Sequence, residues 1–536
     1  MLKKIETIKN FLNNIKLSQK SFRFFVLLIL FFSLAIRAYW GLEKQGLHID
    51  GFLSLMRANH ASTNISIVEG KIYHKEDLFK NLFFYDSNLK DCLGDIKNLY
   101  TKSLENSHTN FYFSLLRLSF LGRSAQTLKS IIETGIALNC LFFVVGFFFF
   151  YKLLLLLYED RFLILATLFC ASVAGGAISN TMFLRPYQLQ SAMLLMLTFV
   201  IVKIIVEKKF TRKMFWTLAL SVSLGLLSGY FSIIYIMLLI LFILFHHLHH
   251  KEREKISYFG ASFLTGAILT PILYPRYWVV ILLGANHAGE AYTKMTFGYF
   301  ISHLIPSTQL VYRFVSSYAI YGLSLFLLLV IFNVLFIWAK RQKLEINYLA
   351  LNIIVIAFLF SVLTILLAPL QAIRYILPVF PLLTLAIPLG IGTFKNDLLK
   401  KTTLFIFIIL FTLNCFNDKK IKYLYENKVP EIDFLAESDA SVCILGVASW
   451  RFLEWTPYAK DEQTYLFFQK PDEFLNYIKN HTSTPGCNYA IIDTLYEKDN
   501  LEDIKNHIRN NFIVSDSLLT AKDDAVGFEV LKLQLK

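Results

Sequence analysis

The sequence is poor in charged residues, since Asp, Glu, Lys and Arg make up 17% of its 536 residues, where a soluble globular protein has about a quarter. Apolar residues make up 55%, and long apolar runs recur from Phe22 to Cys415. A helix needs about 20 apolar residues to cross ~30 Å of hydrocarbon. The composition excludes an ordinary soluble enzyme and indicates a protein that crosses a membrane many times.

Three common sequence signals are also missing. The six cysteines are scattered without the spacing of a zinc site. The first apolar segment follows several lysines, as a signal peptide does, but it continues to Trp40 without a small-residue cleavage site. The polar tail has no glycine motif for nucleotide binding. We therefore expect an uncleaved first span and no nucleotide site in the tail.

The net charge of +14 is distributed unevenly along the chain. Residues 1–415 hold 39 Lys and Arg against 19 Asp and Glu, whereas residues 416–536 hold 14 against 20. Of the 39 cations, 22 fall in six short segments, which are residues 1–23, 152–161, 203–213, 251–255, 340–343 and 395–401. The positive-inside bias places such segments in the cytoplasm, which accounts for the charge without a nucleic-acid partner.

Requiring these segments to alternate with outer loops predicts about eleven spans. They lie near residues 22–41, 130–150, 161–180, 184–203, 214–229, 231–249, 257–275, 313–338, 346–367, 372–394 and 402–415. Residues 215–248 are too many for one crossing, so we expect a tight turn at Ser228-Gly229-Tyr230. This order places the N-terminus, residues 1–21, in the cytoplasm and the tail outside the cytoplasmic (inner) membrane.

The polar regions predict what surrounds the bundle of residues 22–415. The first outer loop, residues 42–129, is longer than a connection needs and includes a helical pattern at Phe111–Leu121, so we expect helices in the membrane interface. The tail, residues 416–536, alternates strand and helix patterns. The predicted strands are residues 441–447, 488–492 and 527–533, and the predicted helices are residues 471–479 and 501–509. The expected fold class is a mainly α, polytopic membrane helical bundle with a small C-terminal α/β domain.

The first candidate for chemistry is Asp50, in the motif Gly46-Leu47-His48-Ile49-Asp50-Gly51 beyond the first span. A carboxylate at the mouth of a membrane cavity can accept a proton from an acceptor hydroxyl or amine within hydrogen-bond reach. Asp50 is the candidate general base, and His48 is a candidate substrate-binding neighbour. The alternative is a solvated loop aspartate or a helix cap.

Two arginine motifs come next, Arg185-Pro186-Tyr187 and Arg374-Tyr375, both at outer span ends in the predicted topology. A guanidinium binds phosphate bidentately and can neutralise the charge that develops on a leaving phosphate. Two arginines from distant spans would converge on one lipid-linked phosphate, with the tyrosines beside them. Each arginine alone could instead extend to the membrane interface.

Histidines give two weaker signals. His108, in Ser107-His108-Thr109-Asn110-Phe111-Tyr112, could position a donor or bind a metal, although a single histidine is more often a packing or surface residue. A cluster near the cytoplasmic side has metal-like spacing, but its place beside Lys251 and Arg253 favours an interfacial helix end. The cluster consists of His246, His247, His249 and His250.

In order and topology, these motifs resemble the protein mannosyltransferase and aminoarabinose transferase superfamily, which are multispan glycosyltransferases of the GT-C type. The resemblance covers roughly residues 20–395. It implies transfer of a sugar from a polyprenyl-phosphate carrier to an acceptor outside the cytoplasm, with Asp50 activating the acceptor and the outer arginines holding the lipid phosphate. The expected reaction is inverting, and the acceptor is lipid A, a polysaccharide or a protein.

The chain departs from the family pattern at two places that carry auxiliary carboxylates. Gly51 follows Asp50 where the family usually has Glu, and Phe183 stands where it often has Glu. Whether the site binds a divalent metal ion therefore stays an open question, because few carboxylates lie near Asp50 in the sequence. Loop acids could substitute, namely Asp77, Asp86, Asp91 and Asp95.

Three other functions stay open at this stage. A transporter or lipid flippase also has many spans and buried cations, although it usually shows an internal repeat, and none is apparent here. A non-catalytic relative of the family would keep the fold without the reaction. The tail could also be a binding module anchored by an inert bundle.

Overall fold

The computed structural model describes most of the chain. The described residues are 18–44, 46–60, 71–74, 88–102, 108–123, 127–278, 296–340, 346–368, 371–424, 442–445, 464–468, 471–480, 489–493, 501–520 and 528–535. They fall into two compact units. Unit 1 comprises Met1–Lys44, Glu105–Tyr112 and Gly135–Leu424, and unit 2 comprises Gln45–Leu104, Phe113–Thr134 and Tyr425–Lys536. Loop residues 77 and 86, proposed above as substitute acids, lie outside the described residues.

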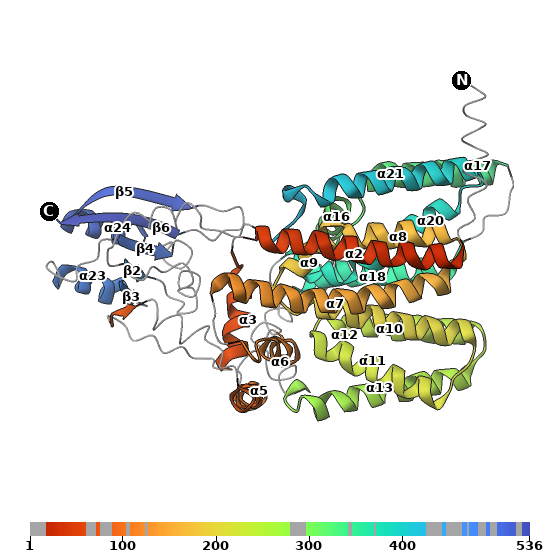
Figure 1. The fold of residues 1–536 in the computed structure, drawn as a ribbon, viewed down its shortest axis with the longest axis horizontal. Coiled ribbons are helices and arrows are strands. Elements are labelled where there is room, and N and C mark those ends of the chain that lie inside the picture. Colours follow the sequence, from red (N-terminus) through yellow and green to blue (C-terminus); the bar gives the residue numbers. More distant parts are fainter. Residues whose placement is uncertain are drawn as a thin grey trace, which may run out of the picture. The chain divides into compact units, whose positions relative to one another are not determined.

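Unit 1 is a bundle of helices that run side by side (Figure 1). Its long helices are α2 (Gln19–Glu43), α7 (Leu128–Leu157), α10 (Tyr187–Glu207), α11 (Arg212–Ser228), α12 (Ser232–His249), α13 (Arg253–Leu273), α16 (Phe297–Tyr318), α17 (Leu323–Ala339), α18 (Tyr348–Leu367) and α21 (Asp397–Cys415). Its short helices are α8 (Arg161–Val173), α9 (Gly175–Met182), α19 (Phe380–Leu383) and α20 (Ala386–Gly392), with the 3₁₀ turns η1 (Ile373–Tyr375), η2 (Leu377–Val379) and η3 (Asp418–Lys420).

Among the described residues, seven helices are long and apolar enough to cross a membrane, or up to nine if each of two bent pairs is one span. The many apolar helices confirm a multispan membrane protein, but the number of about eleven is not confirmed. The predicted span at residues 161–180 is the first bent pair, α8 and α9, which meet at 45°. The predicted turn near Ser228 is confirmed, because α11 ends at Ser228 and α12 begins at Ser232.

Two predicted spans are wrong in detail. Residues 313–338 contain parts of two helices, α16 and α17, which meet at 99°. The bend follows from Gly322, which has a φ of +72°, a left-handed conformation that glycine adopts readily. Residues 372–394 form η1, η2, α19 and α20 instead of one helix. Three prolines, at positions 378, 381 and 388, interrupt this stretch, because proline lacks the N–H that a continuous helix requires.

Two basic segments lie beside each other at one end of unit 1. The guanidinium carbon of Arg161 lies 5.8 Å from the centre of the Phe22 ring. Asn347 Nδ2 donates to the backbone oxygen of Leu157 at 2.6 Å, which joins the region after α17 to the end of α7. Figure 1 shows α2 beginning at the same end of the bundle where α7 ends. The segments that end at Arg23 and Arg161 therefore lie at the same end of the bundle, as the predicted topology expects.

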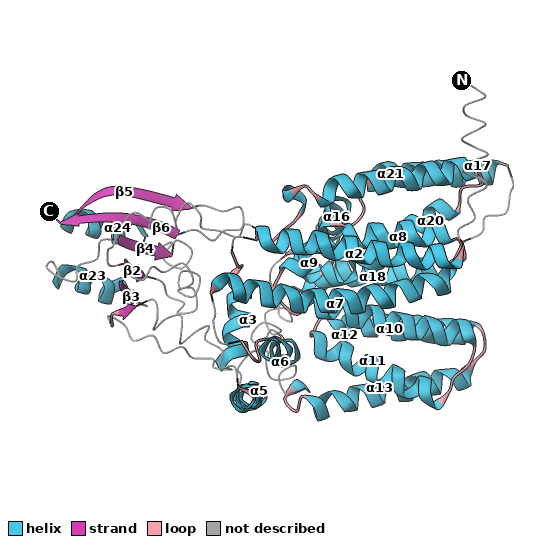
Figure 2. Ribbon diagram, viewed as in Figure 1, coloured by secondary structure: helices cyan, strands magenta, loops and turns pink. Residues whose placement is uncertain are grey.

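Unit 2 combines three helices of the first loop with strands and helices of the tail (Figure 2). The loop helices are α3 (Ile49–His60), α5 (Leu89–Lys102) and α6 (Asn110–Ser119), whose first residues belong to unit 1. The tail contributes β2 (Val442–Leu445), β3 (Thr464–Phe468), α23 (Pro471–Asn480), β4 (Tyr489–Asp493), α24 (Leu501–Asn511), β5 (Phe512–Thr520) and β6 (Phe528–Leu535).

A six-stranded mixed sheet, in the order β1-β3-β2-β4-β6-β5, organises the tail. β2 pairs in parallel with β3 and β4, and β6 pairs antiparallel with β4 and β5. The edge strand β1 (Tyr73–His74) comes from the first loop and places Tyr73 opposite Tyr465. The three predicted strands correspond to β2, β4 and β6, and the two predicted helices to α23 and α24. The tail sheet is therefore completed by a loop more than three hundred residues away in the chain.

Candidate functional site

The Arg185 motif occupies a short buried connection between α9 and α10. Arg185 is 5% exposed, so it does not extend along the outside of the bundle. Two backbone oxygens of this connection, those of Thr181 and Phe183, accept hydrogen bonds from Asn139 Nδ2 at 3.0 and 2.9 Å. The Arg185 N–H donates to the Phe183 oxygen at 2.7 Å. Side-chain amides thus replace the helical hydrogen bonds that the chain loses here.

Aromatic rings connect the two arginine motifs. The ring centres of Tyr187 and Tyr375 lie 6.1 Å apart, with the planes nearly perpendicular. Tyr187 also stacks on Phe183, and Phe231 packs edge-on against Tyr375. Phe183 in turn stacks on Tyr423 at 4.1 Å. We call these five rings the aromatic cluster. It shows that unit 1 brings residues 187 and 375 together, although 188 positions separate them in the sequence.

Arg374 lies at the edge of this cluster. Its guanidinium carbon is 5.2 Å from the centre of the Tyr375 ring, within range of a cation–π interaction. Arg374 belongs to the 3₁₀ turn η1 and is half-buried. The turn replaces the continuous helix that the sequence predicted. It therefore fixes the arginine and the tyrosine beside each other on a proline-interrupted stretch of the bundle.

The segment from His108 also contacts the cluster. The His108 ring packs edge-on against Tyr187, with ring centres 5.8 Å apart. Thr109 Oγ1 donates to the backbone oxygen of Leu227, and Asn110 Nδ2 donates to the Tyr274 hydroxyl at 3.2 Å. His108 is 8% exposed. The histidine is thus a buried neighbour of the Arg185 motif and not a surface residue.

Tyr112 links this segment electrostatically to Arg185. Its hydroxyl donates to Asn139 Oδ1 at 3.3 Å. Burial raises the pKa of the Tyr112 phenol, while the positive charge of Arg185 and the hydrogen bond with Asn139 act in the opposite direction. The phenol therefore stays protonated at neutral pH and can serve as a hydrogen-bond donor beside the arginine.

Asp50 and His48 both belong to unit 2. Asp50 lies in the first turn of α3, where a negative charge is favoured by the helix dipole. The Asp50 N–H donates to His48 Nδ1 at 3.1 Å, and the Asp50 carboxylate lies 3.5 Å from the same nitrogen. Because Nδ1 accepts from the backbone N–H, the imidazole orients the start of the helix through the backbone at Asp50.

Some residues of the site were not predicted from the sequence. Asn139 is buried in α7 and holds both the Arg185 connection and Tyr112. An asparagine within a long apolar run is the signal that could have identified it, because polar residues in a span usually have a specific partner. Phe183, Phe231 and Tyr423 carry no such signal. Phenylalanine is abundant in the chain, with 51 residues, so its position in the sequence distinguishes nothing.

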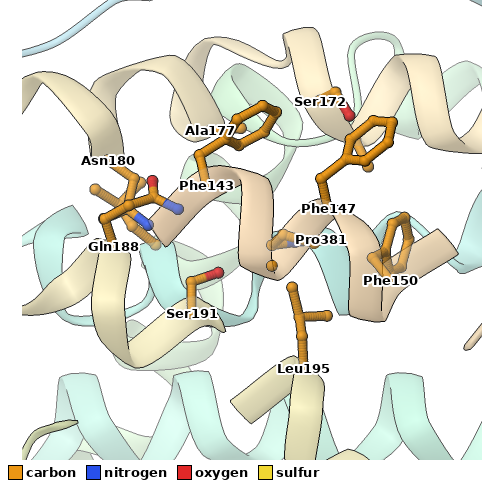
Figure 3. A pocket seen from close by; sticks show the side chains of 13 residues that line it. Phe143, Phe147, Phe150, Ser172, Ala177, Asn180, Gln188, Ser191, Leu195 and Pro381 are labelled. Carbon is orange, nitrogen blue, oxygen red and sulfur yellow. The ribbon is translucent and has the colours of Figure 1, made fainter. Parts of the chain in front are cut away.

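A small cavity with a mainly apolar lining lies within the same bundle (Figure 3). Its volume is about 30 Å³, which is room for about two water molecules. Phe143, Phe147 and Phe150 of α7 form one wall (Figure 3). The polar residues of its lining are Ser172, Asn180, Gln188 and Ser191. The cavity therefore lies directly against α9 and the first turns of α10.

The described residues contain no group of three or more His, Cys, Asp or Glu side chains that could hold a metal ion. The histidine cluster at the end of α12 instead forms ion-pair contacts. His247 Nδ1 lies 2.7 Å and Lys255 Nζ 2.6 Å from the Glu252 carboxylate. Hydrogen bonds from Lys255 and then His247 lower the pKa of Glu252 to about 2. These contacts agree with a helix-end role for the cluster.

No protein-family model and no curated protein matches the sequence. Solved structures do match. ArnT from Cupriavidus metallidurans in the apo state has a TM-score of 0.51 at 9% identity, covering 94% of this chain and 97% of that chain. ArnT bound to undecaprenyl phosphate has a TM-score of 0.48 at 8% identity, with the same coverage. The archaeal oligosaccharyltransferase AglB from Archaeoglobus fulgidus, in complex with an inhibitory peptide and a dolichol-phosphate, has a TM-score of 0.45 at 9% identity, covering 94% of this chain and 74% of that chain.

The similarity to apo ArnT shows the fold. ArnT is an aminoarabinose transferase of the GT-C type, and the match extends over nearly the whole of both chains. The chain therefore has the GT-C fold, as the resemblance of its motifs to that superfamily implied. A shared fold does not fix the reaction, so the function has to be argued from the residues of the site.

Proposed function

We propose that the chain is a membrane glycosyltransferase that moves a sugar from a polyprenyl-phosphate carrier to an acceptor outside the cytoplasm. The observation that carries the proposal is the aromatic contact between the Arg185-Pro186-Tyr187 and Arg374-Tyr375 motifs in a chain of the GT-C fold. Two arginines beside one aromatic cluster suit a phosphate that carries a sugar. A lipid-borne donor also explains why these groups lie at the ends of apolar helices.

In the proposed reaction, the acceptor oxygen or nitrogen attacks the anomeric carbon of the sugar as its proton passes to Asp50. The bond from that carbon to the phosphate oxygen breaks, and the polyprenyl phosphate leaves with the electron pair. Arg185 and Arg374 neutralise the charge that develops on the phosphate. A single displacement of this kind inverts the configuration at the anomeric carbon.

The remaining residues have supporting roles in the proposal. Tyr187, Tyr375 and His108 shape the pocket for the sugar phosphate, and His48 orients the backbone at Asp50 by accepting its N–H at Nδ1. No step of the reaction is assigned to a metal ion. In the proposed topology the N-terminus is in the cytoplasm and the C-terminal domain is on the extracytoplasmic, or periplasmic, face. The acceptor is lipid A, a polysaccharide or a protein.

The test is transfer of a labelled sugar by purified protein in lipid vesicles supplied with a panel of polyprenyl-phosphate sugars and acceptors. Arg185→Ala should lower kcat by roughly 100-fold or more, the usual loss on removing one group that stabilises developing charge. Asp50→Asn should abolish transfer with the protein still folded. Arg313→Ala, which removes an exposed arginine of α16, is the matched control and should leave transfer unchanged.

Wild-type protein that transfers no sugar but moves labelled lipid or solute across the vesicle membrane would favour a flippase or transporter. Full activity of Arg185→Ala would show that this arginine is not needed for sugar transfer. Full activity of Asp50→Asn would exclude that carboxylate as the base.

A further inference from the structure

Arg37 is a fully buried cation within the last two turns of α2, a helix long and apolar enough to cross the membrane. Burying a charge in such a place is costly unless the protein supplies hydrogen bonds. Its guanidinium lies over the Phe143 ring, with the central carbon 3.5 Å from the ring centre. No role in the proposed reaction accounts for this residue.

The Arg37 guanidinium donates hydrogen bonds to several backbone and side-chain oxygens. Its Nη1 donates to the oxygens of Ser33 and Ser172 at 3.0 and 2.9 Å, and its Nη2 donates to the Ala177 oxygen at 3.2 Å. Its Nε donates to Thr181 Oγ1 at 3.0 Å. All four acceptors are neutral oxygens. A cation that is paired with carbonyl and hydroxyl oxygens serves to hold the backbone in place.

Three of these acceptors belong to the broken span formed by α8 and α9. Ser172 precedes the break at Ala174, whereas Ala177 and Thr181 follow it. The guanidinium therefore joins both sides of the 45° bend. A planar group with five donors in a fixed fork can do this, whereas a lysine ammonium presents a single point with three donors.

The contacts continue from Thr181 toward Arg185. The Thr181 hydroxyl, which accepts from Arg37, lies 3.1 Å from Gln188 Oε1 in the first turn of α10. The Thr181 backbone oxygen accepts from Asn139, which also holds the Phe183 oxygen. Arg185 lies two residues further along this connection. Its placement thus depends on the position of α9, which Arg37 fixes.

The cavity borders part of α9. Ala177 and Asn180 of α9 and Gln188 and Ser191 of α10 are among the residues that line it (Figure 3). Close packing normally restrains a helix on every side, but here one side of α9 borders about 30 Å³ of open space. Directional hydrogen bonds from Arg37 therefore add a restraint to the packing of α9.

We propose that Arg37 is a positioning residue, which clamps the α8–α9 break so that Arg185 is held where it binds the donor phosphate. The inference rests on the proposed function, because it concerns the same arginine. It predicts that loosening the clamp weakens recognition of the polyprenyl-phosphate donor while recognition of the acceptor is kept. A misplacement near 1 Å is enough to cost up to about 100-fold in rate.

The experiment uses the full chain in vesicles with two variants. Arg37→Lys keeps the charge but removes the fork, and Thr181→Val removes one acceptor with little change of shape. Both should raise KM for the polyprenyl-phosphate donor by roughly 10- to 100-fold, with KM for the acceptor changed less than about twofold. Thr167→Val is the matched control, since Thr167 is a buried threonine of α8 that donates to the Leu163 oxygen. It should leave both KM values unchanged.

A purely structural role for Arg37 would reduce the amount of active protein, so kcat would fall with both KM values unchanged, and that result would overturn the proposal. Unchanged kinetics of Thr181→Val and Arg37→Lys would overturn it as well. If Arg37→Lys does not fold, the isosteric Thr181→Val decides. Wild-type protein that is inactive with every donor contradicts the proposed function instead, and the clamp is then judged by binding of polyprenyl phosphate, which Thr181→Val should weaken and Thr167→Val should not.

Discussion

At the scale of single residues, Asp95 illustrates how the structure decides between a catalytic and a structural acid. Its carboxylate lies 2.7 Å from Nε of Arg117, which is 0% exposed, while the Asp95 side chain is 20% exposed. Breaking a buried ion pair by removing one partner costs about 3–5 kcal/mol, and partial exposure reduces that figure. This contact assigns Asp95 to the packing of α5 against α6.

We therefore expect Asp95→Asn to destabilise the α5–α6 pair by roughly 2–3 kcal/mol. Hydrogen–deuterium exchange of the backbone amides of α5 and α6 measures this directly, as faster exchange. Asp91→Asn is the control, because Asp91 is an exposed acid one turn earlier on the same helix. It should change exchange little. Lost sugar transfer in Asp95→Asn with unaltered exchange would instead mean that Asp95 serves the reaction.

The sequence suggested the candidate site residues but not the residues that support them. Arg185, Tyr187, Arg374 and Tyr375 were identifiable because a cation at a span end is costly without a purpose. Arg37 was not identified, since an arginine near the end of a span can extend to the interface. Its role depends on oxygens of α8 and α9, which only the folded backbone brings within reach.

At the scale of elements, the close packing of α11 and α13 depends on a small residue. A Cβ added to Gly266 of α13 would lie 2.5 Å from the Ala219 oxygen and 2.7 Å from Val222 Cβ of α11. Both neighbours belong to a helix backbone or are attached to it directly. A side chain at this position therefore requires the two helices to separate, as is typical of small residues at helix interfaces in membranes.

Gly266→Ala should accordingly destabilise the bundle by roughly 1–3 kcal/mol, the usual cost of overpacking, seen as a lower thermal unfolding temperature in detergent. Gly260→Ala on the same helix is the matched control, because nothing lies within 4 Å of a Cβ added there. Its gain in helix propensity, up to about 1 kcal/mol, should leave the temperature equal or higher. Equal effects of the two substitutions would contradict the packing argument.

The sequence predicted the helices that consist of one long apolar run. It did not predict the places where the backbone bends within such a run. Long apolar helices such as α7 and α18 follow from length alone. The 99° bend before Leu323 and the proline-interrupted stretch after Ala372 leave the hydropathy unchanged while altering the path of the chain. In the tail, β3 and β5 were missed although β2, β4 and β6 were predicted. β3 pairs with β1, which comes almost four hundred residues earlier, so its own residues indicate the pairing poorly.

At the scale of the whole molecule, the unequal charge of the chain makes a prediction about orientation. Each side of α18 carries a basic segment, residues 340–343 before it and residues 395–401 after it. If both are cytoplasmic, α18 must cross outward and the interrupted stretch of residues 373–392 must return. That stretch would then be a span although it lacks one long helix, and the count of crossings would exceed the seven uninterrupted helices.

Reporter fusions in cells test this arrangement. Alkaline phosphatase, which is active only outside the cytoplasm, should be active when fused after residue 536 and inactive when fused after residue 255, 343 or 395. Green fluorescent protein at the same positions should give the complementary pattern. If residues 373–392 do not cross, the fusions after residues 343 and 395 will lie on opposite sides of the membrane. That result would place one basic segment outside the cytoplasm, so the positive-inside bias would not determine the topology of this half of the bundle. The C-terminal domain would then lie in the cytoplasm, opposite to the proposed orientation.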